Sequence, residues 1–372
     1  MEDTGTIQTT VAIIGGGLAG AYAAKLLRSA GFDFTLIDAR DRLGGRILSV
    51  DEAGLISNDG FDLGPSWFWP NAQPRLAALV QELGLTTFPQ NNDGDVIFER
   101  MSREIPGRYR AISEERQSMR VTGGTGTLIA AIATDLPHGS VHLNSCLKNM
   151  TMGNGCALLT ISRPDGSQYS VRAKQLIAAL PPRLLANVCF TPAVESSVVR
   201  HWRETATWMA PHAKFIALYQ RPFWREAGLS GTAQSLVGPL VEIHDATTAS
   251  GRAGLLGFIG VPADQRLGMG ELALVKACVD QLVKLYGPDA RHPRATLLKD
   301  WAADPYTATG EDRVPRSHPL PSAESWMTGA WRERLSLAGS ETSAIEPGYL
   351  AGAVAAAERS VSETIGRLES HR

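Results

Sequence analysis

The chain has 372 residues, and its 36 Lys and Arg side chains nearly balance 38 Asp and Glu side chains, which gives a formal net charge of −2. This balance argues against a protein that binds nucleic acid or an anionic membrane, because such proteins normally carry a basic excess. A hydrophobic fraction of 44% and a charged fraction of 20% are ordinary for a globular protein, and the length indicates about two domains.

The cysteine and histidine residues show no spacing typical of a metal site. No two of the four cysteines form a CxxC pair, and only His138 and His142 lie four residues apart. Pro137 and Gly139 place that pair in a turn, so the two rings cannot share a helix face. We therefore expect no metal site, and thiols that stay reduced in a cytoplasmic protein.

Neither end of the chain indicates a targeting segment or a membrane span. The first ten residues contain two acids, no Lys or Arg and no long apolar stretch, unlike a signal peptide. No run approaches 18 uninterrupted apolar residues, the minimum for a transmembrane helix. The sequence therefore predicts a protein that neither spans a membrane nor binds nucleic acid.

The first forty residues predict a strand, a glycine-rich turn, a helix and a second strand. The run TVAII is apolar and β-branched, AYAAKLLRSA is apolar at helical spacing, and FTLI is a second short strand. Between the first strand and the helix, GGGLAG spaces three glycines as GxGxxG. In this pattern Gly15 allows a tight turn, Gly17 lets backbone approach a pyrophosphate, and Gly20 lets helix and strand pack closely. The helix start at Leu18 and Ala19 offers N–H groups to phosphates.

The second strand ends at Asp38, 18 residues after Gly20. An acid at this place accepts hydrogen bonds from the ribose hydroxyls of an adenosine. With strand, helix, second strand and acid in register, the sequence predicts a dinucleotide-binding unit, and a glycine-rich turn without a nucleotide is the alternative. The pattern does not choose between NAD and FAD.

The residues that follow the second strand carry a family resemblance. The string DARDRLGGR, residues 38–46, resembles the second signature of the flavin-containing amine oxidases, which belong to the superfamily of monoamine oxidases, polyamine oxidases and phytoene desaturases. Gly44 and Gly45 permit a loop that wraps a pyrophosphate, and Arg46 can place its guanidinium against a phosphate. A surface salt bridge is the alternative for Arg46.

The resemblance continues in order along most of the chain. It is carried by DLGPSW (residues 62–67), VTGGTGTL (121–128), VHLNSCL (141–147), AALPP (178–182), and LAGSET (337–342) followed by PGYLAGAV (347–354). In the family these segments lie beside the flavin ring, begin a helix, contact the adenine, form a crossover and make the last flavin-binding segment. The series implies FAD rather than NAD. The cofactor-binding residues that it implies are Gly15, Gly17, Leu18, Ala19, Gly20, Asp38, Ala39, Arg40, Gly44, Gly45, Arg46, Gly64, Pro65, Ser66, Trp67, Leu147, Glu341, Gly348, Tyr349 and Leu350.

The resemblance also implies an α/β fold, in which an FAD-binding Rossmann-like domain of the GR2 type carries a second, α+β substrate domain built on a mixed sheet. We expect the cofactor domain to be discontinuous, from residues 1–70, 121–195 and 320–372. The substrate domain is expected from residues 71–120 and 196–319.

Within the expected substrate domain, alternating and apolar runs at residues 215–219, 234–244 and 254–261 predict strands of a sheet that roofs the flavin. Residues 271–286 predict an amphipathic helix, which a Gly-Pro pair stops. The three prolines of residues 314–321 predict a loop.

Three residues are the catalytic candidates that the resemblance implies. Lys214 lies in an alternating strand beside apolar neighbours, where an unpaired cation is costly. In the family a Lys in this strand, before a PFW sequence, holds a water against flavin N5, and the alternative is a lysine that reaches solvent. Trp301 resembles a Trp that lines the flavin cavity, and Tyr349 resembles the aromatic residue beside the substrate nitrogen. For both rings, core packing is the alternative.

The chain departs from the family pattern in four respects. Residues 343–348 contain no Cys, so FAD should be noncovalent, and the second aromatic residue of the usual amine cage is absent there. The acid that ends the second strand is Asp38 rather than the commoner Glu. Only 35 residues separate Leu85 from Val121, enough for one hairpin and a short turn in place of a helical cap. We expect a shallow, open site for a bulky amine, or a partner chain that acts as a lid.

The resemblance implies oxidation of an amine C–N bond to an imine, with dioxygen or another acceptor taking the electrons. Most of the catalysis would be positioning in a dry cavity. Two alternatives stay open: a flavin dehydrogenase or desaturase with a non-oxygen acceptor, and a noncatalytic subunit stabilised by FAD. The sequence leaves open the amine, the electron acceptor and whether the protein is a homodimer.

Overall fold

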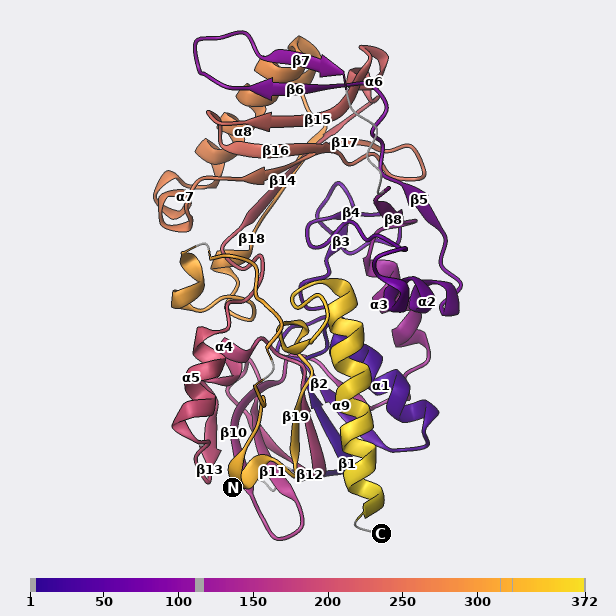
Figure 1. The fold of residues 1–372 in the computed structure, drawn as a ribbon, viewed down its shortest axis with the longest axis vertical. Helices are drawn as coiled ribbons and strands as arrows, with labels where there is room; N and C mark the ends of the chain where they lie inside the picture. Colours follow the sequence, from indigo (N-terminus) through magenta and orange to yellow (C-terminus); the bar gives the residue numbers. More distant parts are fainter. Residues whose placement is uncertain (1–4, 111–116, 315, 323, 371–372) are drawn as a thin grey trace. The chain divides into compact units, whose positions relative to one another are not determined.

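The computed structural model describes residues 5–110, 117–314, 316–322 and 324–370 (Figure 1). The chain packs into two compact units, each built on its own sheet. Unit 1 consists of residues 1–46, 128–208 and 316–372, and unit 2 of residues 47–127 and 209–315.

The two units divide the chain differently from the predicted domains. Residues 47–70, expected in the cofactor domain, pack within unit 2, because Phe61 shares a buried cluster with Ile216 of the unit 2 sheet. Residues 196–208, expected in the substrate domain, pack within unit 1, where Trp202 is fully buried. Burial of large apolar side chains, rather than the order of motifs along the chain, sets these boundaries.

In the described residues, unit 1 has an eight-stranded sheet in the order β13-β10-β11-β12-β1-β2-β9, with β19 also paired to β12. Strand β1 runs parallel to both β12 and β2 and ends in four buried residues, as expected for a strand covered on both faces. Its strands are β1 (Ile7–Ile14), β2 (Phe34–Ile37), β9 (Val141–His142), β10 (Cys146–Met152), β11 (Ala157–Ser162), β12 (Gln168–Ala178), β13 (Cys189–Thr191) and β19 (Leu335–Leu337).

Helices of unit 1 cover this sheet, and the longest of them packs along α1 and across β12 and β19 (Figure 1). This helix, α9, presents a row of small buried residues, Ala353, Ala356, Ala357 and Ser360, which permit close packing. The helices are α1 (Leu18–Ser29), α4 (Pro182–Leu185), α5 (Ser196–Glu204) and α9 (Leu350–Ser370), with the short 3₁₀ helices η4 (Gly329–Trp331) and η5 (Ser340–Thr342). Helix α3 (Gly126–Thr134) begins at the end of unit 2 and continues into unit 1.

The predicted start of the chain is confirmed, since β1 ends at Ile14, α1 begins at Leu18 and β2 ends just before Asp38. The predicted strand over residues 141–147 is interrupted. Asn144 adopts a left-handed φ of 53°, which ends the extended run between β9 and β10, and Asn tolerates this conformation better than most residues.

In the described residues, unit 2 has a seven-stranded mixed sheet in the order β18-β14-β17-β16-β15-β6-β7, and two small antiparallel pairs, β3-β4 and β5-β8. Its strands are β3 (Ser49–Val50), β4 (Phe61–Asp62), β5 (Thr87–Pro89), β6 (Asp95–Glu99), β7 (Gly107–Arg110), β8 (Met119–Val121), β14 (Ala213–Tyr219), β15 (Leu229–Ser235), β16 (Leu240–Asp245), β17 (Ala253–Ile259) and β18 (Ala295–Asp300). Its helices are α2 (Pro74–Glu82), α6 (Phe223–Glu226), α7 (Ala263–Met269) and α8 (Glu271–Tyr286), with the 3₁₀ helices η1 (Pro288–Arg291), η2 (Trp301–Ala303) and η3 (Gly310–Arg313).

Helix α8 confirms the predicted amphipathic helix and covers one face of the unit 2 sheet (Figure 1). Its buried residues Leu274, Cys278 and Leu282 pack with Phe215 and Ile243 of the strands. The strand residues that alternate with these, among them Lys214, therefore point to the opposite face of the sheet.

Two predicted segments of unit 2 differ in detail from the structure. The predicted strand over residues 234–244 is two strands, β15 and β16, because Gly238 and Pro239 turn the chain between them. Residues 86–120 contain the predicted hairpin as β6 and β7, although residues 111–116 lie outside the described residues. The described part of the predicted loop 314–321 has no helix or strand, and Pro315 lies outside the described residues.

Candidate functional site

The glycine loop of unit 1 keeps space open at one of its three motif glycines. At Gly15, φ is +101° and a Cβ atom would lie 2.5 Å from the carbonyl oxygen of Ala179. At Gly20, a Cβ atom would lie 1.8 Å from the carbonyl oxygen of Gly15. At Gly17, the nearest atom beyond its chain neighbours would be the carbonyl oxygen of Gly44, at 3.8 Å. Packing of the chain itself demands glycine at positions 15 and 20, whereas Gly17 leaves a clear space at the N-terminus of α1. The predicted contact of Gly17 with a pyrophosphate stays a prediction.

Asp38 fixes the shape of this loop. Its buried carboxylate accepts the N–H of Gly16 at 2.6 Å and the N–H of Arg40 at 2.7 Å. Burial raises the pKa of the Asp38 carboxyl, and the two backbone hydrogen bonds oppose that shift. The N–H of Ser145 donates to the carbonyl oxygen of Asp38 at 2.8 Å, which brings the segment before Leu147 to the same edge of the sheet. The adenosine roles of Asp38, Ala39, Arg40 and Leu147 stay predictions.

The second glycine pair folds back onto the first loop. Gly44 has φ of +106° and donates its N–H to the carbonyl oxygen of Gly16 at 2.8 Å, and a Cβ atom on Gly45 would lie 3.1 Å from Cα of Gly17. Arg46 is ion-paired with Glu341, whose side chain is buried, at 2.5 Å between Nη1 and Oε1. Its guanidinium is therefore held by a buried carboxylate rather than by a surface partner, and its contact with a phosphate stays a prediction.

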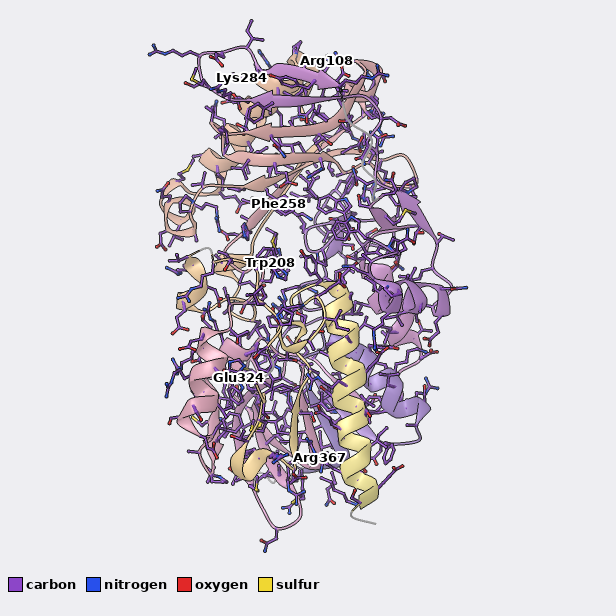
Figure 2. The ribbon with its side chains drawn as sticks, viewed as in Figure 1. Arg108, Trp208, Phe258, Lys284, Glu324 and Arg367 are labelled. Atoms are coloured by element: carbon purple, nitrogen blue, oxygen red, sulfur yellow. The ribbon has the colours of Figure 1, made fainter. Side chains whose placement is uncertain are left out.

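The turn before α9 carries an aromatic stack. The backbone N–H of Gly348 donates to the carbonyl oxygen of Ser340 at 3.0 Å, and Tyr349 follows directly before Leu350 begins the helix. The ring centroid of Tyr349 lies 4.8 Å from that of His318, with 29° between the planes. His318 in turn contacts Trp208, labelled in Figure 2, edge-on at 4.4 Å. Tyr349 thus has an aromatic neighbour, which comes from the proline-rich loop rather than from residues 343–348.

Lys214 is buried in β14 of unit 2, so the solvent-reaching alternative is wrong. Its Nζ donates to the carbonyl oxygens of Asp62 at 3.0 Å and Gly64 at 2.6 Å, and to Oγ of Ser66 at 2.8 Å. Burial lowers the pKa of the Lys214 amine to about 7; the carboxylate of Asp62 opposes this shift and the charge of Arg120 adds to it. The three acceptors account for all three ammonium protons, so a water can be held only if one of them is exchanged.

Residues 62–66, to which Lys214 donates its hydrogen bonds, are also held by hydrogen bonds from other segments. The Asp62 carboxyl, whose pKa burial raises, accepts from Ser49 and Thr125 through Oδ1, while Oδ2 has no hydrogen-bond partner among the described residues. Oγ1 of Thr125 also donates to the carbonyl oxygen of Pro65 at 3.0 Å. The loop over residues 62–66 is therefore rigidly shaped before any ligand arrives.

Two tryptophans complete the arrangement in unit 2. The buried ring of Trp301 donates its Nε1–H to the carbonyl oxygen of Leu63 at 3.0 Å. Trp67 donates its Nε1–H to Gln90 at 2.7 Å, and its ring centre lies 5.5 Å from Nζ of Lys214. The structure thus brings the predicted residues Lys214 and Trp301 to the same short loop, which also contains Gly64, Pro65 and Ser66 and is followed directly by Trp67.

Sequence reasoning missed the residues that surround these candidates. Trp208 and His318 of unit 1, and Phe258 and His244 of unit 2, lie in no recognised motif. The alternation along β17 and β16 is the one signal that points Phe258 and His244 to the same face as Lys214.

In the described ranges, no group of three or more His, Cys, Asp or Glu side chains is placed to hold a metal ion. Among the helices that the structure describes, none combines the length and apolarity needed to cross a bilayer.

Residues 99–365 match a family described as flavin containing amine oxidoreductase, and residues 13–83 match an NAD(P)-binding Rossmann-like domain. The chain is 22% identical to the probable flavin-containing monoamine oxidase A of Dictyostelium discoideum over 92% of this chain and 94% of that protein. It is 22% identical to the putrescine oxidase of Kocuria rosea, over 81% and 84% respectively. Cyclohexylamine oxidase from Brevibacterium oxydans IH-35A aligns in structure with a TM-score of 0.79 at 20% identity, covering 97% of this chain and 99% of that one. At that identity the structural likeness shows the fold alone, and it agrees with the predicted pairing of a Rossmann-like part and a mixed-sheet part.

Proposed function

Since the chain belongs to the flavin containing amine oxidoreductase family, it is an oxidoreductase with FAD as its cofactor, and we propose that it oxidises the C–N bond of an amine. Two electrons and two protons leave the amine, and water hydrolyses the resulting imine to an aldehyde or ketone and ammonia or a smaller amine. Dioxygen takes up the two electrons and two protons and leaves as H₂O₂. Bound FAD supplies the two-electron acceptor that no protein side chain provides.

The unit 1 residues fit the nucleotide part of this cofactor. The space at Gly17 and the free N–H groups at the start of α1 suit a pyrophosphate, and Asp38 stands at the strand end where ribose hydroxyls bind. We include in the proposal all the cofactor-binding residues expected from the sequence. The absence of Cys from residues 343–348 supports noncovalent attachment.

The observation that carries the proposal is the environment of Lys214. A buried amine with a pKa of about 7 exists in both protonation states near neutral pH, so it can take or release a proton at Nζ. By exchanging one backbone acceptor, Lys214 holds a water at the reacting centre while its other two hydrogen bonds keep the loop over residues 62–66 in place. Trp67 and Phe258 cover the amine with apolar surface and exclude bulk water, while Trp301 holds the same loop through Leu63.

Tyr349 has the second role in the proposal, because its ring precedes α9 and is held by a stack on His318. An aromatic face orients a neutral amine without a charged partner and keeps its nitrogen lone pair available. Neither Tyr349 nor Trp301 acts as a general base in this proposal.

Anaerobic spectroscopy tests the proposal. Amines should bleach the yellow holoprotein under nitrogen, and mixing with dioxygen should restore the colour with one H₂O₂ per turnover. Bleaching that dioxygen does not reverse, while a quinone does, would replace the oxidase with a dehydrogenase. No bleaching across a broad amine panel would leave the noncatalytic reading. Flavin released by denaturation would show noncovalent attachment.

A further inference from the structure

The carboxyl group of Asp62, whose backbone carbonyl accepts from Lys214, is buried and has no role in the function proposed above. Three donors lie within hydrogen-bond distance of its Oδ1: Oγ of Ser49 at 2.5 Å, and the N–H and Oγ1 of Thr125 at 2.8 Å and 2.9 Å. Its Oδ2 has no hydrogen-bond partner among the described residues. An unpartnered oxygen on a buried carboxyl group costs free energy, which calls for an explanation beyond packing.

Gly124 makes room for this arrangement. It has φ of +93°, and a Cβ atom there would lie 2.7 Å from Oγ of Ser49 and 3.0 Å from Oδ1 of Asp62. A residue with a side chain would therefore push Thr125 and the start of α3 away from the carboxyl group. The glycines of the segment VTGGTGTL, residues 121–128, thus serve in this chain to bring hydrogen-bond donors against Asp62.

Two buried cations act on Asp62. The charges of Arg120 and Lys214 lower the pKa of its carboxyl group, against the burial that raises it. The effect is reciprocal, because the charge of Asp62 raises the pKa of the Lys214 amine while the charge of Arg120 lowers it. Asp245 also acts on Arg120, but it is itself ion-paired with Arg225 at 2.6 Å. Asp62 is therefore the carboxylate that favours a proton on Lys214 against burial and a neighbouring cation.

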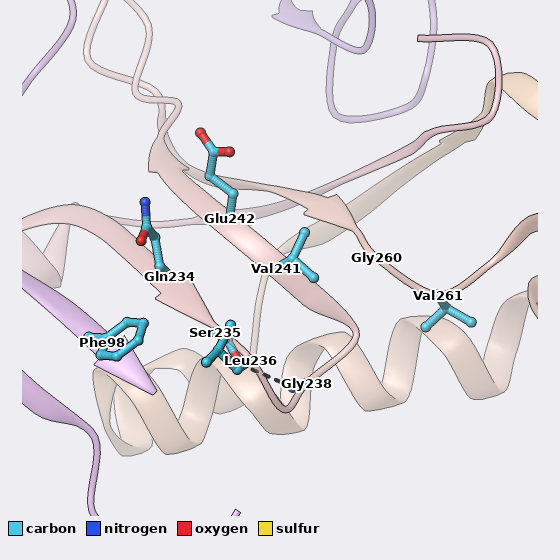
Figure 3. A pocket seen from close by; sticks show the side chains of 9 residues that line it. All are labelled: Phe98, Gln234, Ser235, Leu236, Gly238, Val241, Glu242, Gly260 and Val261. Carbon is cyan, nitrogen blue, oxygen red and sulfur yellow. Dashed lines mark hydrogen bonds between the residues drawn. The ribbon is translucent and has the colours of Figure 1, made fainter. Parts of the chain in front are cut away.

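In the described part of the sheet, the other charged groups on the face of Lys214 are paired or exposed. Lys299, its cross-strand neighbour on β18, is ion-paired with Asp304 at 2.9 Å. Glu242 lies two strands away, exposed beside a hollow of about 540 Å³ (Figure 3), and its Oε1 lies 2.6 Å from Nε2 of His244. Because solvent screens exposed charges, neither pair replaces the buried carboxylate.

We propose that Asp62 is a positioning residue for Lys214: its carboxylate fixes the loop whose carbonyl oxygens receive the ammonium, and supplies the negative charge that keeps a proton on Nζ against the charge of Arg120. This inference rests on the proposed amine oxidation and adds the residue that sets the charge of its central lysine. A neutral amine has only two N–H groups for three acceptors. Loss of the Asp62 charge would therefore also release one of the bonds from Lys214 to the loop.

The test titrates Lys214 itself in the FAD-loaded protein, by ¹³C NMR with lysine labelled at Cε. The signal that the variant Lys214→Met lacks belongs to Lys214, and in wild type its midpoint should lie near pH 7. Asp62→Asn keeps Oδ1 as the acceptor for Ser49 and Thr125 and places the amide nitrogen where Oδ2 has no described partner. It removes the charge and leaves the loop in place, so the midpoint should fall by about one pH unit.

Two further variants separate a charge effect from damage to the fold. Arg120→Met removes the opposing charge, so the midpoint should rise. Glu242→Gln removes an exposed charge on the same face and should leave the midpoint unchanged. If the role of Asp62 were only structural, both buried substitutions would admit water and raise the midpoint. Asp62→Asn and Arg120→Met each have a required sign, so either one decides if the other does not fold.

The titration needs no turnover, so it tests this inference apart from the proposed function. If amines reduce the flavin, the pH profile of anaerobic reduction should shift in each variant in the same direction as the midpoint of Lys214. No reduction across an amine panel would defeat the proposed oxidation and leave the NMR midpoints to decide the role of Asp62. An unchanged midpoint in Asp62→Asn, or shifts of the same sign in Asp62→Asn and Arg120→Met, would overturn the inference.

Discussion

Two candidate binding regions of the molecule are built in opposite ways. One is the cradle formed by the glycine loop of unit 1, with Gly15, Gly17 and Gly20, and the other is the lysine face of the unit 2 sheet, which carries Lys214. In the cradle, backbone atoms of residues close in sequence make the site, and side chains contribute mainly by being absent, as at Gly17. On the lysine face, side chains from distant segments converge: Lys214 meets Ser66, and Trp301 meets Leu63. A backbone site leaves a strict local motif in the sequence, whereas a side-chain site leaves isolated residues whose neighbours only the fold reveals.

The largest effects should come from substitutions at Gly20 and Gly17, and the two effects should differ in kind. Gly20→Ala places a Cβ atom 1.8 Å from the carbonyl oxygen of Gly15, so we expect loss of the folded unit 1. Gly17→Ala meets no protein atom closer than 3.8 Å, so the chain should fold while its affinity for FAD falls about ten-fold or more. Circular dichroism and flavin retention on gel filtration distinguish the two. Wild-type flavin retention in Gly17→Ala would remove the cradle from the site.

On the lysine face of unit 2, the substitution Lys214→Met should reduce turnover and leave FAD binding intact. The variant removes the amine that can hold a water and exchange a proton, so we expect FAD content to stay near one per chain while turnover falls about 100-fold. Lys276→Met, on the exposed side of α8, is the matched control and should behave as wild type. Turnover in Lys214→Met close to that of the control would take Lys214 out of the mechanism.

The pH dependence of stability tests whether Lys214 is buried as an amine with a lowered pKa. The pKa of Lys214 is about 7 in the folded chain, below its ordinary value of 10.5, so between these pH values the unfolded chain binds more protons. The free energy of unfolding should therefore rise with pH in this window, by up to about 1.4 kcal/mol per pH unit. Urea titrations at pH 7.5 and pH 9 measure this slope, and Lys214→Met should reduce it. Identical slopes in both proteins would show that the lysine is not buried as an amine.

The smallest effect should come from Trp301→Phe, which keeps an apolar ring and deletes the hydrogen bond to Leu63. The carbonyl oxygen then loses one partner, and we expect a loss of about 1 kcal/mol in stability with only a modest rise in KM. Thermal unfolding and steady-state kinetics measure both quantities. A large loss of kcat with unchanged stability would assign Trp301 a direct contact with the reacting groups instead of a positioning role.

The order of motifs predicted the start of the chain, the long last helix and the amphipathic helix α8, because each has a local periodicity or a glycine with a local cause. Local patterns predicted strand ends less well where a single residue or turn interrupts a strand. Asn144 interrupts one predicted strand, and the Gly238-Pro239 turn divides another. The stack of Tyr349 on His318 could not be predicted from the sequence, because no local pattern in a proline-rich loop indicates a contact with a distant turn.

The sequence by itself determined the family, the cofactor and the residues of the glycine loop, because phosphate binding by backbone requires particular residues at fixed, short separations. The tertiary structure alone decided that Lys214 is buried with three acceptors, that Arg46 is paired with Glu341, and that residues 47–70 pack with the second unit. These features depend on strand register and on which apolar surfaces meet, and both are set by contacts between segments far apart in the chain.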